Sequence, residues 1–250
     1  MSGDPKQLGP TIRSTVAGML GLGMSFIERL MKTKVYNEVK GCGKSVVKLT
    51  KNFRSHGAIL KFPNNRFYSR DLECCGDPKL INFYFDSQHL VAKKFQIVFP
   101  VAEKDDREAS SLASFNIDEA TQVKIFGTPI LINASHTADN DIGVIAPYHA
   151  QVLKMCTALR AVADSTKVGS VEEFQGQERH VIIISTVRNS REFVKYDLRH
   201  TLGFVANPRR FNVAVTRAQS LLYYIVGDPS VQSIDPLWQS FLNYIHRSGG

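Results

Sequence analysis

The sequence predicts an α/β protein in which helices flank a mostly parallel β-sheet. Short apolar runs of the kind found in buried strands alternate along the chain with amphipathic helical patterns, which favours a parallel sheet. The run Val181–Val187 is nearly continuous in apolar residues, as is typical of a strand covered on both faces. The 250 residues, 43% of them hydrophobic, are enough to bury a core in one or two domains.

Five strands are predicted from these apolar runs. In chain order they are Val46–Thr50, Phe95–Val101, Ile142–Ala146, Val181–Val187 and Leu221–Val226.

Helices are expected between the strands. Ser25 to Glu28 form a capping box at the start of one helix. Ser55 is expected to cap a short helix that stops near Pro63, and Asn207-Pro208 to begin another. Two further helical faces lie within Val152–Ala163 and Leu237–Ile245, a surface loop is expected over Ala102–Ser114, and an irregular stretch over Gly127–Asn140.

The composition argues against several classes of protein. No apolar run approaches the ~18–20 residues needed to span a bilayer, so no membrane partner is expected. The N-terminus lacks the basic and then apolar pattern of a signal peptide. The four cysteines form no CxxC pair and no disulfide framework, which favours a reducing, intracellular compartment. The adjacent Cys74 and Cys75 have no second pair with which to bind a metal.

The charge is strongly basic and unevenly distributed. The net charge is +8, and basic side chains are concentrated in residues 1–61 and 179–217, on either side of an acidic middle. This asymmetry suits a polyanion, of which nucleic acid is the first candidate; the alternative is a solvated basic surface.

Two motifs resemble nucleotide-site elements but fail on inspection. Gly41 to Ser45 looks like the end of a P-loop, but the full pattern needs a glycine where Glu38 stands. Asp118-Glu119 looks like a magnesium-binding Asp-Glu box, but the preceding residues are too polar for a buried strand. These two acidic residues fit better in the first turn of a helix, and no metal ligand is predicted.

Four other segments identify a protein family much more specifically than these two motifs do. They are Gly3–Pro10, Lys51–His56, Gly169–Glu178 and Phe211–Ala218, with Ile142–Tyr148 as a supporting match. In this order they resemble motifs III, IV, V and VI of superfamily 1 helicases of the Up-frameshift-like group. The resemblance is greatest to the Moloney leukaemia virus ten-type, Armitage and silencing-defective RNA helicases. It implies a RecA-like P-loop NTPase fold, with the end of a first RecA-like domain and a connecting helix in residues 1–45 and the second RecA-like domain in 46–250.

The same resemblance implies a set of nucleotide contacts. Arg54 and Arg217 would be arginine fingers for the γ-phosphate of ATP, a task that suits the planar, always charged guanidinium. Gln7 would sense the γ-phosphate, Gly176 would allow close backbone approach, and Glu178 would accept a hydrogen bond from the ribose. Arg54 is expected at the carboxyl end of the strand 46–50, and Arg217 on the helix beginning at Pro208.

RNA contacts are implied as well. Ser170 would bind a backbone phosphate, and the Pro147-Tyr148 turn would lie beside the strand. Tyr148 could stack a base or pack on the core. Arg188 could contact phosphate or pair across a domain interface. Ala146 stands where the family has Ser or Thr, so a hydroxyl ligand is lost there.

The function implied is an ATP-dependent RNA helicase moving 5′ to 3′ in RNA silencing or RNA turnover, in the cytoplasm or its ribonucleoprotein granules. Its expected partners are single-stranded RNA, an upstream RecA-like domain with the P-loop and the Mg²⁺ ligands, and RNA-silencing proteins. Without that domain the chain is not expected to hydrolyse ATP. The alternatives are a truncated, non-catalytic module that binds RNA or a partner, and a DNA helicase of the same superfamily.

Overall fold

The structure is a computed structural model that describes residues 1–250 except 11, 13, 38, 40, 42, 85–94, 102–104, 108–113, 134–137, 201–206 and 249–250; the side chains of 126–133, 197, 199 and 200 are also outside the description. The chain forms two compact units, Met1–Lys51 and Asn52–Gly250. The assignment of residues 1–45 to the end of a first RecA-like domain stays a prediction.

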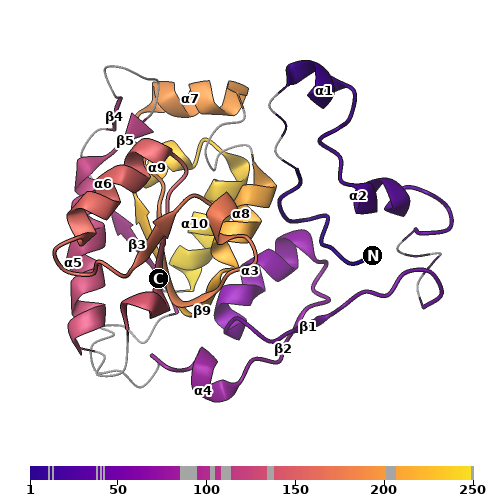
Figure 1. The fold of residues 1–250 in the computed structure, drawn as a ribbon, viewed down its shortest axis with the longest axis horizontal. Coiled ribbons are helices and arrows are strands. Elements are labelled where there is room, and N and C mark those ends of the chain that lie inside the picture. Colours follow the sequence, from indigo (N-terminus) through magenta and orange to yellow (C-terminus); the bar gives the residue numbers. More distant parts are fainter. Residues whose placement is uncertain are drawn as a thin grey trace. The chain divides into compact units, whose positions relative to one another are not determined.

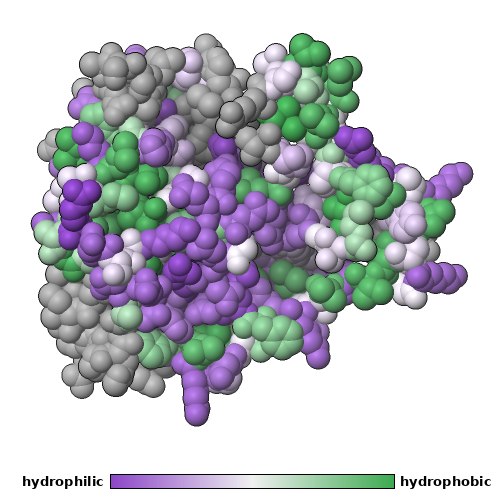
Figure 2. All heavy atoms as spheres, in the orientation of Figure 1, coloured by the Kyte–Doolittle hydropathy of each residue, from purple (hydrophilic) through white to green (hydrophobic). Residues whose placement is uncertain are grey.

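The first unit contains two short helices, α1 (Thr15–Met19) and α2 (Phe26–Met31). The predicted capping box at α2 is present in part, because the Ser25 hydroxyl accepts a hydrogen bond from the Glu28 amide at 3.3 Å. Apolar side chains cover the exposed surface of α1 (Figure 2).

The predicted strand Val46–Thr50 is wrong. Only Val46 makes an isolated bridge, and residues 47–50 pair with no strand. Val47 and Leu49 are 79% and 81% exposed, so their apolar side chains have no sheet face to cover. A short apolar run predicts a strand only where the tertiary fold supplies a neighbour to pair with.

The second unit is built on a five-stranded, all-parallel sheet (Figure 1). The spatial order is β3-β9-β8-β6-β7, and each neighbouring pair runs parallel. The bounds are β3 (Gln96–Pro100), β9 (Ala218–Val226), β8 (Arg179–Ser185), β6 (Ile142–Ile145) and β7 (Lys167–Gly169). The predicted α/β class and four of the five predicted strands are confirmed, while β7 was missed because three residues carry too little pattern.

Two small sheets lie outside the main one. β1 (Lys51–Asn52) pairs with β2 (Glu73–Cys74), and β4 (Asp106–Arg107) pairs antiparallel with β5 (Ser114–Phe115). β4 and the first residue of β5 fall within the stretch expected to be only a loop, 102–114, so that expectation is corrected at these residues.

Helices cover both faces of the main sheet (Figure 1). On one face α5 (Ile117–Asn133) and α6 (His149–Leu159) pack on each other and on the strands. On the other face an aromatic cluster of Phe62, Phe211, Tyr224, Trp238 and Phe241 joins α3 (Gly57–Phe67), α8 (Pro208–Val215) and α10 (Pro236–Arg247) to β9. The remaining elements are α4 (Pro78–Ile81), α7 (Arg191–His200), α9 (Pro229–Gln232) and the 3₁₀ turns η1 (Asp139–Asp141) and η2 (Glu172–Phe174).

Helix α3 differs from the prediction at both ends. Its cap is His56, whose Nδ1 accepts from the Ala58 amide at 3.1 Å, because the Ser55 hydroxyl is buried and donates instead to the Ala218 carbonyl at 2.7 Å. The helix also continues past Pro63 to Phe67. Phe62 and Pro63 are both buried, so tertiary packing offsets the backbone hydrogen bond that the proline removes.

Helix α5 corrects the expectation of an irregular stretch over 127–140. It continues through Gly127 and Pro129 to Asn133, and η1 follows at 139–141; residues 134–137 lie outside the described part. Burial of Ala120 and Val123 stabilises the first turns, and each residue added to an existing helix costs little conformational entropy because it also adds a backbone hydrogen bond. Asp118 and Glu119 do lie in the first turn of α5, as predicted. No helix in the described part is both long enough and apolar enough to cross a membrane.

Candidate functional site

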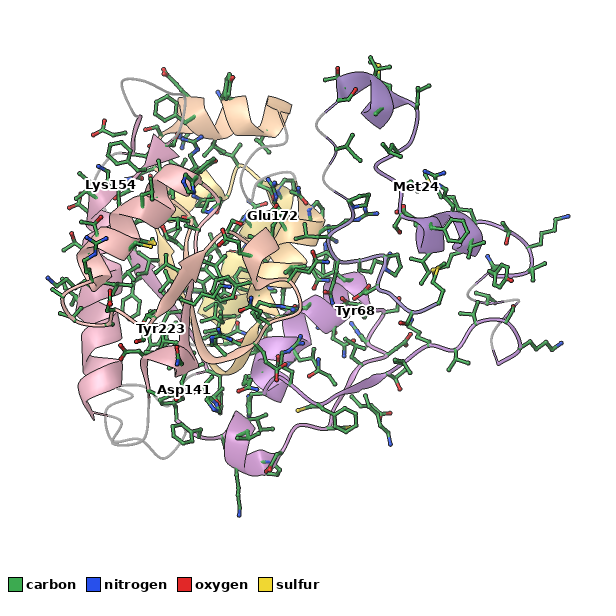
Figure 3. The ribbon with its side chains drawn as sticks, viewed as in Figure 1. Met24, Tyr68, Asp141, Lys154, Glu172 and Tyr223 are labelled. Carbon is green, nitrogen blue, oxygen red and sulfur yellow. The ribbon has the colours of Figure 1, made fainter. Side chains whose placement is uncertain are left out.

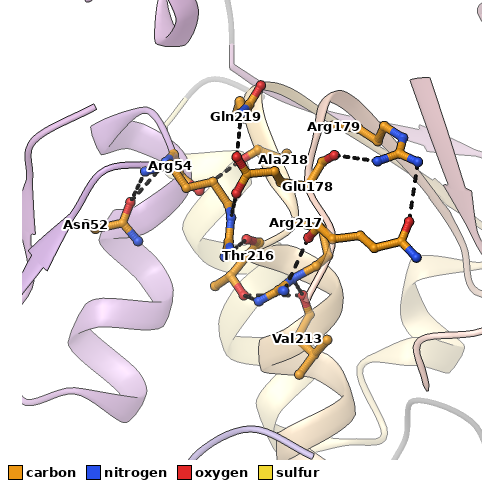
Figure 4. Close-up of polar contacts among 11 residues, drawn as sticks. Asn52, Arg54, Glu178, Arg179, Val213, Thr216, Arg217, Ala218 and Gln219 are labelled. Carbon is orange, nitrogen blue, oxygen red and sulfur yellow. Dashed lines mark hydrogen bonds and ion pairs between the residues drawn. The ribbon is translucent and has the colours of Figure 1, made fainter. Parts of the chain in front are cut away.

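Two of the predicted site residues, Arg54 and Glu178, meet at the surface of the second unit (Figure 4). Arg54 follows β1 and Glu178 precedes β8, and the Arg54 Nε atom lies 2.5 Å from Glu178 Oε2. Arg54 Nη1 also donates to the Thr216 carbonyl at 3.3 Å, directly before Arg217. Segments separated by more than a hundred residues are thereby joined at one place.

The backbone around Arg54 is held by its neighbours. The Asn52 side-chain oxygen accepts from the amides of Arg54 at 3.1 Å and Ser55 at 2.9 Å. The His56 amide donates to the Gln219 carbonyl at 2.8 Å, so this segment is docked on the start of β9. Arg54 was expected at the end of a strand of the main sheet; it instead follows the two-residue β1, which lies outside that sheet.

Glu178 uses both of its carboxylate oxygens. Oε2 pairs with Arg54, and Oε1 accepts from the Gln219 side-chain amide at 3.0 Å. The hydrogen bond from Arg54, with its positive charge, lowers the pKa of Glu178. The Glu178 side chain is 46% exposed, so a carboxylate stays ionised in reach of solvent.

Arg217 is held differently from Arg54. It lies just after the C-cap Thr216, and not on α8 as predicted, and only 2% of it is exposed. Its Nε donates to the Val213 carbonyl at 3.1 Å and its Nη1 to the Gln177 carbonyl at 3.3 Å. These bonds orient the guanidinium before any ligand arrives.

Two further residues of this site are Gly176, which adopts a positive φ angle, and Phe53, whose ring is exposed. Gly176 has φ +78° with open space where a Cβ would stand, so the turn before β8 needs the left-handed conformation that glycine adopts without strain. Phe53, directly before Arg54, is 71% exposed. The sequence analysis missed Phe53, although an exposed aromatic ring beside an arginine is a plausible surface for a flat ligand.

Gln7 belongs to the first unit. Its side-chain amide donates to Asp4 Oδ2 at 3.0 Å, and the Lys6 amide donates to Asp4 Oδ1 at 2.8 Å, which closes a turn.

A second cluster forms at the carboxyl ends of β6, β7 and β8, which carry Tyr148, Ser170 and Arg188 shortly after their last residues. Arg188 Nε donates to the Tyr148 hydroxyl at 3.1 Å, and the guanidinium carbon lies 4.6 Å from the centre of the Tyr148 ring. Arg188 is 3% exposed and pairs with the buried Asp105 at 3.1 Å. Arg188 is thus engaged inside the fold, while Tyr148 and Pro147 are half-buried.

Ser170 lies in a reciprocal cap. Its amide donates to Glu173 Oε1 at 3.0 Å, and the Glu173 amide donates to the Ser170 hydroxyl at 3.4 Å. The neighbouring Ala146 amide donates to the Gly169 carbonyl at 3.1 Å, which joins the end of β6 to the end of β7.

A buried carboxyl that the sequence analysis did not assign supports the turn after β8. Glu119 Oε2 accepts from the Ser185 hydroxyl at 2.5 Å and from the Val187 amide at 3.0 Å. Val187 has φ +70°, a strained conformation for a β-branched residue. Complete burial raises the pKa of Glu119 to about 7. The sequence alone does not distinguish this buried glutamate from the exposed acidic residues that are common in the first turn of a helix.

The segments of the site are also tied to each other. Glu172, labelled in Figure 3, accepts from Arg210 Nε at 2.8 Å, which links η2 to α8.

Among the described residues no group of three or more His, Cys, Asp or Glu side chains could hold a metal ion.

Comparison with known proteins shows the family to which the chain belongs. Residues 22–230 match the family described as "AAA domain" (AAA_12). The chain is 43% identical to "RNA helicase Mov10l1" of Homo sapiens and to its Mus musculus counterpart, in each case over 100% of the chain but 21% and 22% of the relative. It is 30% identical to "Regulator of nonsense transcripts 1 homolog" of Neurospora crassa, over 96% of the chain and 21% of that protein. The chain spans about a fifth of the length of these curated relatives.

Proposed function

Because the chain belongs to the AAA_12 family of AAA domains, we propose that it is the second motor domain of an ATP-dependent helicase that moves 5′ to 3′ along single-stranded RNA. The observation that carries this proposal is the meeting of Arg54, Glu178 and the backbone beside Arg217 at one surface. Two arginines and a ribose-binding acid are the groups that a second motor domain contributes to ATP.

The two arginines would act on the transferring phosphoryl group. Hydrolysis spreads negative charge over its oxygens, and a guanidinium stabilises that charge at little cost if it is oriented in advance. Arg217 is already oriented by backbone carbonyls, and Arg54 is a more exposed partner of Glu178. The exposed ring of Phe53 would offer a stacking surface to the base.

The chain does not hold every group that ATP needs. The sequence contains no complete P-loop, and the described residues include no cluster fit for Mg²⁺. We therefore assign the phosphate cradle and the Mg²⁺ ligands to an upstream RecA-like domain, whose final segment would be residues 1–45 with Gln7 as the γ-phosphate sensor.

RNA would pass over the carboxyl ends of β6 and β7. Tyr148 would stack a base and Ser170 would bind a backbone phosphate, contacts that carry little sequence information. Since Arg188 is buried, it would support the track by holding Tyr148 in place. We also propose a role in RNA silencing or turnover, in the cytoplasm or its granules and with RNA-silencing partners; this part of the proposal rests on the motif resemblance to the RNA-silencing helicases.

A blot of cell extract first gives the size of the natural protein. The test then compares RNA-stimulated ATP hydrolysis by that protein with hydrolysis by the 250-residue chain alone. We expect turnover only when the upstream domain is present, and Arg54→Ala should reduce kcat by about 10³-fold or more. Arg54 is the better site than the buried Arg217 because its loss leaves no cavity in the core. Lys61→Ala, on the exposed side of α3, is the control.

Other outcomes would contradict the proposal. A native polypeptide near 28 kDa without turnover would favour the binding module instead. Turnover stimulated by single-stranded DNA but not by a matched RNA would favour a DNA helicase.

A further inference from the structure

One residue in the site, Gln219, has no role in the proposed chemistry, yet it makes two hydrogen bonds there, one through its side chain and one through its backbone. Its side-chain amide donates to Glu178 Oε1 at 3.0 Å (Figure 4). Its backbone carbonyl accepts from the His56 amide at 2.8 Å. It stands as the second residue of β9, a mostly buried strand that lies between β3 and β8 in the main sheet. Gln219 therefore connects Glu178 to the main sheet and to the segment that carries Arg54.

The Arg54–Glu178 ion pair conflicts with the roles of both residues. While Arg54 Nε is bonded to Glu178 at 2.5 Å, that N–H cannot point at a phosphate. The side chains are 26% and 46% exposed, and ion pairs at such surface positions contribute little to stability. A triphosphate carries more charge than one carboxylate, so it would draw Arg54 away.

That exchange leaves the Glu178 carboxylate with one hydrogen-bond partner among the described residues, Gln219. A carboxylate that loses a charged hydrogen-bond donor gains freedom to rotate into solvent, and ordering it again costs side-chain entropy. Gln219 is the remaining donor, and it binds the oxygen that Arg54 does not use. The backbone bond from His56 does not depend on the Arg54 guanidinium, so Gln219 keeps its place when Arg54 moves.

We propose that Gln219 is a positioning residue, which holds the Glu178 carboxylate toward the ribose when Arg54 turns from Glu178 to the phosphate. This inference rests on the proposed function, since it assigns a support to the ribose contact of the same site. Gln219 contacts neither nucleotide nor RNA in this scheme and acts only through Glu178.

The experiment measures KM and kcat for ATP and for 2′-deoxy-ATP in the natural protein and in its Gln219→Leu variant. Leucine keeps much of the volume but has no N–H to donate. Losing a hydrogen bond that orients a charged group should raise the KM for ATP about 5-fold, with kcat within about 2-fold. The KM for 2′-deoxy-ATP should change less than about 2-fold, because that substrate already lacks one donor for Glu178.

Gln239→Leu is the matched control, since Gln239 lies exposed on α10 and its side chain makes no hydrogen bond to the described part of the chain. Gln219→Ala is the second variant if leucine prevents folding. An equal rise in KM for both nucleotides, or no rise for either, would overturn the positioning role while leaving the helicase proposal intact. Absence of turnover in the unaltered protein would overturn the proposed function first, and the role of Gln219 with it.

Discussion

Arg188 donates a hydrogen bond to the Tyr148 hydroxyl at 3.1 Å, across 40 positions of the chain. The other side of the guanidinium pairs with Asp105 at 3.1 Å and with the Ser114 hydroxyl at 2.6 Å. Arg188 and Asp105 are 3% and 4% exposed, so the ion pair is enclosed by the fold. The orientation of Tyr148 consequently depends on a buried network.

Removing Arg188 should destabilise the protein strongly. Arg188→Ala leaves the buried Asp105 carboxylate without its cation, and we expect the free energy of unfolding to fall by about 3–5 kcal/mol. Urea denaturation followed by circular dichroism at pH 7.5 measures the change. Arg191→Ala, exposed at the start of α7, should stay within about 0.5 kcal/mol, and a loss below 1 kcal/mol for Arg188→Ala would contradict the buried ion pair.

Removing the ring of Tyr148 should weaken RNA binding. If the ring stacks on a base, Tyr148→Ala should reduce affinity for a single-stranded 20-nucleotide RNA about 5- to 150-fold, as loss of ~1–3 kcal/mol implies. Fluorescence anisotropy at a stated salt concentration measures it. Leu153→Ala, exposed on helix α6, which begins directly after Tyr148, serves as the control, and equal affinity of both variants would assign Tyr148 to packing alone.

The buried Glu119 should make stability depend on pH. Its pKa is raised from 4.5 to about 7 by burial, so the folded state binds a proton that the unfolded state releases. The contribution is therefore complete below about pH 4.5 and is lost as the pH rises through 7, at ~3 kcal/mol in total. Glu119→Gln removes this titration, and the difference in unfolding free energy between variant and unaltered protein should change between pH 5.5 and 8. A constant difference would show that Glu119 does not titrate in this range.

The N-terminus of α10 should be sensitive to its cap. Asp235 is buried, and one of its oxygens accepts from the amides of Leu237 at 2.8 Å and Trp238 at 3.1 Å. Asp235→Ala should cost about 1–2 kcal/mol of unfolding free energy. Asp235→Asn keeps an acceptor and should recover most of it in thermal or urea denaturation, whereas equal losses for both would assign the effect to the charge.

The α/β class with a mostly parallel sheet could be predicted because it depends on local pattern. A strand covered on both faces must be apolar throughout, and the runs at 142–146, 181–187 and 221–226 carry that pattern in the sequence itself. The run at 46–50 has a similar pattern but lacks a neighbour, and α5 contains two helix-breaking residues yet continues. Pairing and packing between distant segments decide such cases.

The sequence by itself determined the fold class, the family resemblance and the residue types of the site: two arginines, a glutamate, a serine and a tyrosine. Only the tertiary structure decided which of these groups are oriented, buried or exposed, and it added Glu119, Asp105 and Gln219 as their supports. The physical reason is that a motif is a local property of the chain, whereas the burial of a charge and its hydrogen-bond partner depend on residues far apart in sequence.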